Sequence, residues 1–160
     1  FIQWDNNMIN VDIINYYKNI EKARKYKKEG KTQKEIYYYN NALKIYGTGI
    51  TNEFSGLEID KICLGIHNEA MGITTEIIKY YEDQKDFEKL LKLCEQRISW
   101  DDLDIDIAQI KTNTLIELDR KIEAKRYINS FNENFQNEIG EIPQLDPQLL
   151  KLLVLKKNVW

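Results

Sequence analysis

Apolar residues recur every three to four positions along most of this chain, with polar and charged residues between them. This spacing is typical of amphipathic helices rather than of strands. We expect about seven helices, and their short connections predict antiparallel neighbours. The positions expected to face the core are Ile13, Tyr16 or Tyr17, Ile20, Ala23 and Tyr26, then Ile36, Tyr39, Ala42, Leu43 and Tyr46, then Leu90, Leu91 and Cys94, and later Ala124, Ile128 and Phe131.

Two capping boxes predict where internal helices begin. Thr32–Glu35 and Ser55–Glu58 each place a hydroxyl residue at the N-cap and a glutamate three positions later. The helix after the second box is expected to continue to about residue 84. Gly65 and Gly72 fall inside it, where each costs about 1 kcal/mol relative to alanine. We therefore expect either a close approach by a neighbouring helix or a bend or break at these glycines.

Further signals mark the last connection and a central helix start. Gly140 is suited to the left-handed conformation that ends a helix, and Pro143 cannot continue one. Asp146 is then expected as an N-cap with Pro147 at the first helical position. Asp86 is likewise expected to begin a helix.

A 34-residue offset relates two helical pairs. Leu90 recurs as Ala124, and Cys94 recurs as Ile128. This is the period of tetratricopeptide repeats, although the first pair lies 55 residues earlier. We expect an all-α fold, a tetratricopeptide-like right-handed superhelix of about seven antiparallel helices over residues 11–160. Residues 1–10 are expected to be a linker or the tail of a preceding domain.

Composition narrows the class. The 160 residues are 42% hydrophobic and 31% charged, which is the balance of a folded domain. A net charge of −3 gives no global attraction to nucleic acid. No apolar run is long enough for a membrane helix. Cys63 and Cys94 lack the spacing of a redox or zinc motif, so we expect a reducing, cytoplasmic setting.

Three patterns resemble phosphate-binding or metal-binding motifs, but structural roles explain them better. Gly30–Thr32 lacks the earlier glycine and strand of a phosphate-binding loop. Cys63 and His67 supply at most half of a metal site. Asp102–Asp106 resembles a calcium loop, but Ile107 stands where that loop needs glycine, so we expect helix capping instead. We predict no metal, no cofactor and no catalysis, with a helical enzyme as the least favoured alternative.

The candidates for partner binding lie in the first two helices. Lysine and arginine gather over Lys22–Lys34, which predicts a solvated helix face or, alternatively, a contact with DNA phosphates. Tyr37 and Tyr38 cannot both share the core face of the second helix, so at least one is expected at the surface or in a groove. We therefore assign Tyr37, Tyr38, Arg24 and Lys28 as partner-binding candidates.

The order of segments resembles the bacterial transcriptional activator domain, the tetratricopeptide-like module of antibiotic regulatory protein type regulators. Val11–Tyr16 is similar to its Val-Asp-x-x-x-Phe opening, and Gly30–Gly47 is similar to its Gly…Ala-Leu-x-Leu-Tyr-x-Gly segment. Tyr80–Cys94 is similar to the central repeat. Glu123–Pro143 is similar to the closing Glu-Ala…Glu-Leu-Gly-x-x-Pro. Departures include Lys85 where glycine is common.

This resemblance implies a non-catalytic module that follows a winged-helix DNA-binding domain. Its partners would be a second copy, RNA polymerase or a sensor domain, and DNA would be read only by the attached domain. The family's glycine in the last hairpin is replaced by Asp119 or Arg120. The alternative is a tetratricopeptide-like peptide-sensing or scaffold module unrelated to transcription.

Overall fold

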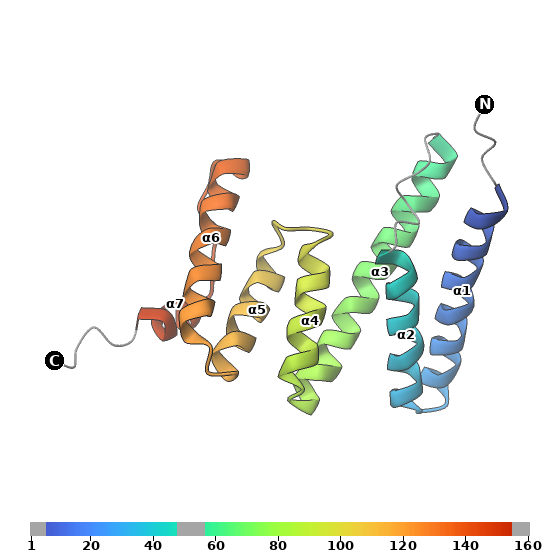
Figure 1. Cartoon of the computed structure of the whole chain (residues 1–160), viewed down its shortest axis with the longest axis horizontal. Coiled ribbons are helices and arrows are strands. Elements are labelled where there is room, and N and C mark those ends of the chain that lie inside the picture. Colours follow the sequence, from blue (N-terminus) through green and yellow to red (C-terminus); the bar gives the residue numbers. More distant parts are fainter. Residues whose placement is uncertain (1–5, 48–56, 155–160) are drawn as a thin grey trace. The chain divides into compact units, whose positions relative to one another are not determined.

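The computed structural model describes residues 6–47 and 57–154, with side chains over residues 12–47 and 60–149 and at Lys151. This part of the chain is all-α, with seven helices and no strand, as the periodicity predicts (Figure 1). The helices are α1 (Asn6–Lys28), α2 (Thr32–Gly47), α3 (Leu57–Gln84), α4 (Phe87–Ile98), α5 (Ile105–Glu117), α6 (Lys121–Ile139) and α7 (Pro147–Val154).

The chain divides into two compact units, residues 1–77 and 78–160. α3 continues through the point of division as one unbroken helix. The two units are described separately.

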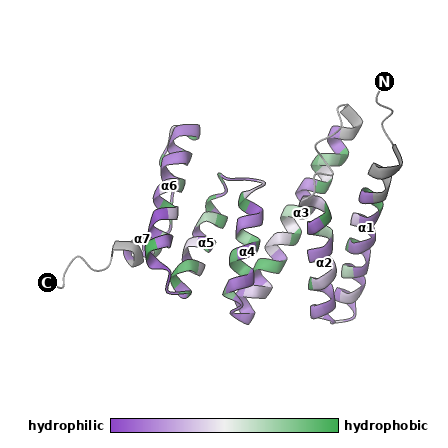
Figure 2. Ribbon diagram, in the orientation of Figure 1, coloured by the Kyte–Doolittle hydropathy of each residue, from purple (hydrophilic) through white to green (hydrophobic). Residues whose placement is uncertain are grey.

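α1 and α2 pack against each other as the first hairpin of the first unit (Figure 1). All five expected core positions of α2 are buried. On α1, Tyr16 is fully buried while Tyr17 is 40% exposed, which decides between these two neighbours. Burying a large apolar side chain stabilises the fold by about 1.5–3 kcal/mol, so this interface supplies much of the unit's stability. Figure 2 shows hydrophobic and hydrophilic residues alternating along the helices.

The first part of α3 contacts both helices of this hairpin. Buried residues recur along it every three or four positions, at Ile66, Ala70, Ile73 and Ile77. Glu69 pairs with Arg24 of α1, and the Tyr46 hydroxyl of α2 lies 2.7 Å from Nδ1 of His67. These polar contacts supplement the apolar packing between α3 and the first hairpin.

The two glycines inside α3 have open space around them. A Cβ added at Gly65 or Gly72 would meet no atom within 4 Å, and both positions are exposed. Of the two expected explanations, a close approach by a neighbouring helix is therefore not found among the described residues. The helix is also not broken at either position.

The second unit has a layered apolar core. Leu91, Leu115 and Ala124 form one cluster, and Tyr127 packs against it. A second cluster consists of residues from α5 and α6 with neighbours from the following segment, namely Ala108, Ile128 and Phe131, with Ile105, Tyr127, Phe135 and Leu145 against them. α7 contacts α5 and α6, and Leu149 is buried.

Three helix–helix turns share one backbone geometry. A residue one or two positions past the end of the helix has positive φ: 68° at Gly30, 53° at Lys85 and 58° at Asp119. In each turn, two backbone amides donate hydrogen bonds to carbonyls in the last turn of the helix. The donors are the amide of the positive-φ residue and the amide of the residue after it, which is the Schellman arrangement. A single residue then separates it from the first residue of the next helix. The turns at Lys85 and Asp119 are 34 residues apart, the offset that the sequence repeat predicts.

Several helix boundaries differ from those expected. α1 begins at Asn6, so residues 6–10 of the expected linker or tail are helical, and residues 1–5 lie outside the described part. Thr32 is the first residue of α2 and not its N-cap, because the Lys31 carbonyl accepts the first helical bond from Glu35. The box at Ser55–Glu58 starts outside the described residues.

The remaining boundary signals are confirmed. Asp86 accepts a bond from the Lys89 amide at the start of α4. Gly140 ends α6 with φ 81°, and Pro143 is buried. Asp146 accepts from the Gln148 amide at 2.8 Å ahead of α7. These signals act over two to four residues, which is why the sequence alone predicts them.

Candidate interaction surface

A cluster of aromatic rings joins α1 to α2 at the surface of the first hairpin. The rings of Tyr26 and Tyr38 stack with centroids 5.4 Å apart and planes 9° from parallel. Tyr37 meets Tyr38 edge-on at 5.2 Å. Tyr26 lies in the last turn of α1, and Tyr37 and Tyr38 lie in the first two turns of α2. The tight connection at Gly30 therefore brings the three rings together.

Three lysines place their ammonium groups over these rings. Nζ of Lys22 lies 5.2 Å from the centroid of Tyr38. Nζ of Lys31 and Nζ of Lys34 lie 5.8 Å and 5.2 Å from the centroid of Tyr26. Each contact contributes about 0.5–1 kcal/mol at an exposed site. We call Lys22, Tyr26, Lys31, Lys34, Tyr37 and Tyr38 the tyrosine–lysine cluster.

The three consecutive tyrosines have separate environments. Tyr37 is 62% exposed, Tyr38 is half-buried against Tyr26, and Tyr39 is buried in the core. The expectation that at least one of Tyr37 and Tyr38 reaches the surface is confirmed. Because Tyr38 supports Tyr37 from the side, the exposed ring is held rather than free to rotate away.

Arg24 and Lys28, the other two candidates, lie on another stretch of surface. With Glu21, Lys25 and Glu29 they line a shallow groove of about 460 Å³ along α1. A guanidinium nitrogen of Arg24 lies 2.6 Å from Glu69, so its charge is already paired within the unit. Among the described residues, no hydrogen bond or cation–π contact joins Arg24 or Lys28 to Tyr37 or Tyr38.

Four of the six residues of the cluster are not among the predicted binding candidates. Tyr26 was assigned to the core, and Lys22, Lys31 and Lys34 were read only as part of a basic stretch. The available signal was the spacing of Lys22 and Tyr26, which are four residues apart and so share a helix face. Their proximity to Tyr38 depends on the hairpin and has no local signal.

A second polar feature lies between the three helices of the first unit. Lys27 of α1 pairs with Glu76 of α3 and lies 3.7 Å from Glu35 of α2. The hydrogen bond to Glu76 raises the pKa of Lys27. Burial raises the pKa of Glu35, and the negative charge of Glu76 adds to this while Lys27 opposes it. Glu35 is the buried member of this ion cluster and does not take the capping-box role expected from its spacing.

The groups with nucleophilic or metal-binding chemistry are engaged or buried. Burial raises the pKa of the Cys94 thiol to about 12, so it is protonated at neutral pH. Cys63 is half-buried, and His67 bonds with Tyr46. Over the described ranges, 6–47 and 57–154, no three His, Cys, Asp or Glu side chains are grouped so that they could hold a metal ion.

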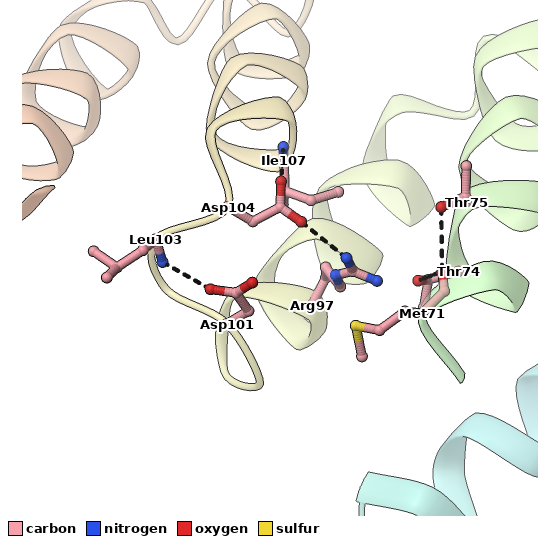
Figure 3. Close-up of polar contacts among 8 residues, drawn as sticks. All are labelled: Met71, Thr74, Thr75, Arg97, Asp101, Leu103, Asp104 and Ile107. Atoms are coloured by element: carbon pink, nitrogen blue, oxygen red, sulfur yellow. Dashed lines mark hydrogen bonds and ion pairs between the residues drawn. The ribbon is translucent and has the colours of Figure 1, made fainter. Parts of the chain in front are cut away.

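The acidic turn before α5 is a helix cap, as expected. Asp104 accepts from the Ile107 amide at 3.1 Å, and its other oxygen lies 2.9 Å from Arg97 (Figure 3). Asp101 accepts from the Leu103 amide. Both carboxylates are thus satisfied by local amides and a neighbouring cation.

A second hollow, of about 370 Å³, lies among the end of α3, α4 and α5 in the second unit. Apolar Phe87, Leu90 and Ile110 line it with several polar residues. Thr114 also lines it, but its hydroxyl donates to the Ile110 carbonyl within α5.

Within the described residues, no helix has the length and apolar character needed to cross a membrane. Comparison with protein-family models, with curated proteins and with solved structures finds no match to this chain.

Proposed function

We propose that this chain is a non-catalytic protein-interaction module of a bacterial transcriptional regulator, built from stacked helical hairpins. Its contacts would be with a second copy, RNA polymerase or a sensor domain, while DNA would be read by an attached winged-helix domain. A tetratricopeptide-like right-handed superhelix is part of this proposal. The three turns of common geometry and the 34-residue spacing of two of them support it.

The observation that carries the interaction role is Tyr37. Its ring is 62% exposed yet braced edge-on by Tyr38, on a surface with several cations. Tyrosine is enriched at protein interfaces because a rigid amphipathic ring buries a large area at little entropic cost. An exposed tyrosine ring does not improve solubility, so a binding role explains its position better.

The transcriptional assignment is supported by where the resembling segments lie. Ala42, Leu43 and Tyr46, which carry the Ala-Leu-x-Leu-Tyr likeness, are buried on α2. Gly140 adopts the left-handed conformation and Pro143 is buried, as the closing motif would require. The residues of the resemblance therefore serve structural roles that a related fold would share.

The test pairs binding with a transcriptional readout. The 160-residue chain is immobilised, and binding of purified bacterial RNA polymerase and of a second copy is measured. The chain is also fused to a heterologous winged-helix domain that targets a reporter promoter. Tyr37→Ala is expected to weaken partner binding about tenfold or more. Tyr17→Ala, which removes another exposed tyrosine of the same unit, is the matched control.

Binding to either partner together with an altered reporter signal would support the proposal. A chain that neither self-associates nor binds RNA polymerase, and that leaves the reporter unchanged, would overturn the transcriptional assignment. Binding to unrelated peptides in that case would favour the scaffold alternative.

A further inference from the structure

We infer that the tyrosine–lysine cluster docks an acidic segment of a protein partner, in which Asp and Glu flank an aromatic or aliphatic side chain. The inference rests on the proposed function and deepens it, because it names the chemistry that the interaction surface recognises. It follows from the charge of the first hairpin, from the lysines over the rings and from the exposed ring of Tyr37.

The first hairpin is basic in a chain that is acidic overall. Between Lys18 and Lys34 there are eight lysines and arginines and two glutamates, whereas the whole chain has a formal charge of −3. A local basic field of this kind attracts and orients an acidic partner segment. The remainder of the chain, being negative, disfavours a partner that is anionic over a long stretch.

Two ammonium groups of the cluster are available for a carboxylate. Lys27 and Lys31 each pair with a glutamate of the same unit. In contrast, Lys22 and Lys34 are exposed and make no ion pair with a carboxylate among the described residues. Their contacts with the rings of Tyr38 and Tyr26 restrict where these ammonium groups lie, so less entropy is lost on binding.

Tyr37 supplies an exposed aromatic anchor in the same cluster. It lies on α2 beside Tyr38, three residues after Lys34. An apolar or aromatic side chain of the partner would cover its exposed ring, while flanking carboxylates would meet the ammonium groups. Hot spots of protein interfaces combine aromatic anchors with nearby charges in this way.

A single-stranded nucleic acid fits this surface less well. Proteins that bind such strands offer free aromatic faces on which bases stack. Here Tyr26 and Tyr38 stack on each other, and lysine ammonium groups lie over both rings. Only Tyr37 remains open, and one ring cannot hold successive bases.

The experiment measures fluorescence anisotropy with the full 160-residue chain. The probe is a labelled peptide of about twelve residues, half of them Asp or Glu, with one central Trp. We expect saturable binding that weakens as salt is raised. Lys22→Gln with Lys34→Gln should weaken it about fivefold or more, and Tyr37→Ala about tenfold. Lys79→Gln with Lys125→Gln, two exposed lysines elsewhere, should change it less than about twofold.

Three results would overturn the inference: no saturable binding of the acidic peptide, an equal loss in the control variant, or tighter binding of a single-stranded oligonucleotide of equal charge. The outcome is separable from that of the proposed function. If RNA polymerase or a second copy binds the chain and Tyr37→Ala weakens that binding, but the acidic peptide does not bind, this inference fails while the proposed function stands.

Discussion

Three turns place one residue each in the left-handed backbone region, and in two of them this residue carries a side chain. Gly30, Lys85 and Asp119 all have φ between 53° and 68°. Glycine reaches this region freely, aspartate moderately well and lysine poorly, because a Cβ crowds the following carbonyl. The left-handed backbone therefore costs least at Gly30 and most at Lys85.

Lys85→Gly is expected to stabilise the protein by about 1 kcal/mol, since it removes the left-handed strain while keeping the Schellman bonds. Asp119→Gly should stabilise it less, because aspartate tolerates this conformation better. Urea unfolding of both variants measures the free-energy changes. A destabilised Lys85→Gly variant would show that its side chain makes a contribution larger than the strain.

At the scale of elements, α3 contains two interior glycines, and no described residue packs closely against either of them. Gly65→Ala and Gly72→Ala should each stabilise the protein by about 1 kcal/mol, because both sites are exposed and a Cβ meets nothing. Thermal or urea unfolding reports the change. Gly30→Ala is the matched control and should destabilise by a similar amount, since its φ is positive.

The ion cluster of Glu35, Lys27 and Glu76 makes the packing of α1, α2 and α3 depend on pH. Because the folded state raises the pKa of Glu35, it binds this proton more tightly than the unfolded state does. The charged form therefore weakens the fold, and this loss appears as pH rises through the folded-state pKa. The free energy of unfolding of Glu35→Gln, relative to that of the natural protein, should therefore increase as pH rises from 4 to 7.

Urea unfolding of both proteins across this range measures the difference. Glu133→Gln, which removes an exposed carboxylate on α6, controls for the loss of a surface charge. A difference between Glu35→Gln and the natural protein that does not change with pH would contradict the prediction.

At the scale of the whole molecule, the division at residue 77 predicts two units of local stability. Leu115→Ala in the second unit and Leu43→Ala in the first each remove a fully buried side chain and should cost about 2–5 kcal/mol. Hydrogen exchange should show lost protection mainly in the unit that carries the substitution, because each core is local. Uniform loss along the chain in both variants would indicate a single cooperative unit.

Much of the fold was predictable because its signals are local. The core positions of α2, the cap at Asp86 and the helix end at Gly140 each depend on residues within one or two turns of helix. The expected capping role of Glu35 was wrong for the opposite reason, because its carboxylate lies beside Lys27 of another helix.

Sequence alone determined the helical class, most core faces and the position of the basic hairpin, because a period near 3.6 and a few capping residues specify them. Only the tertiary structure decided which polar side chains remain available. Arg24 is paired by Glu69, which lies 45 residues away, while Tyr26 and Tyr38 meet through the turn at Gly30. Such pairings depend on how helices pack, and packing is a property of the folded chain rather than of any short segment.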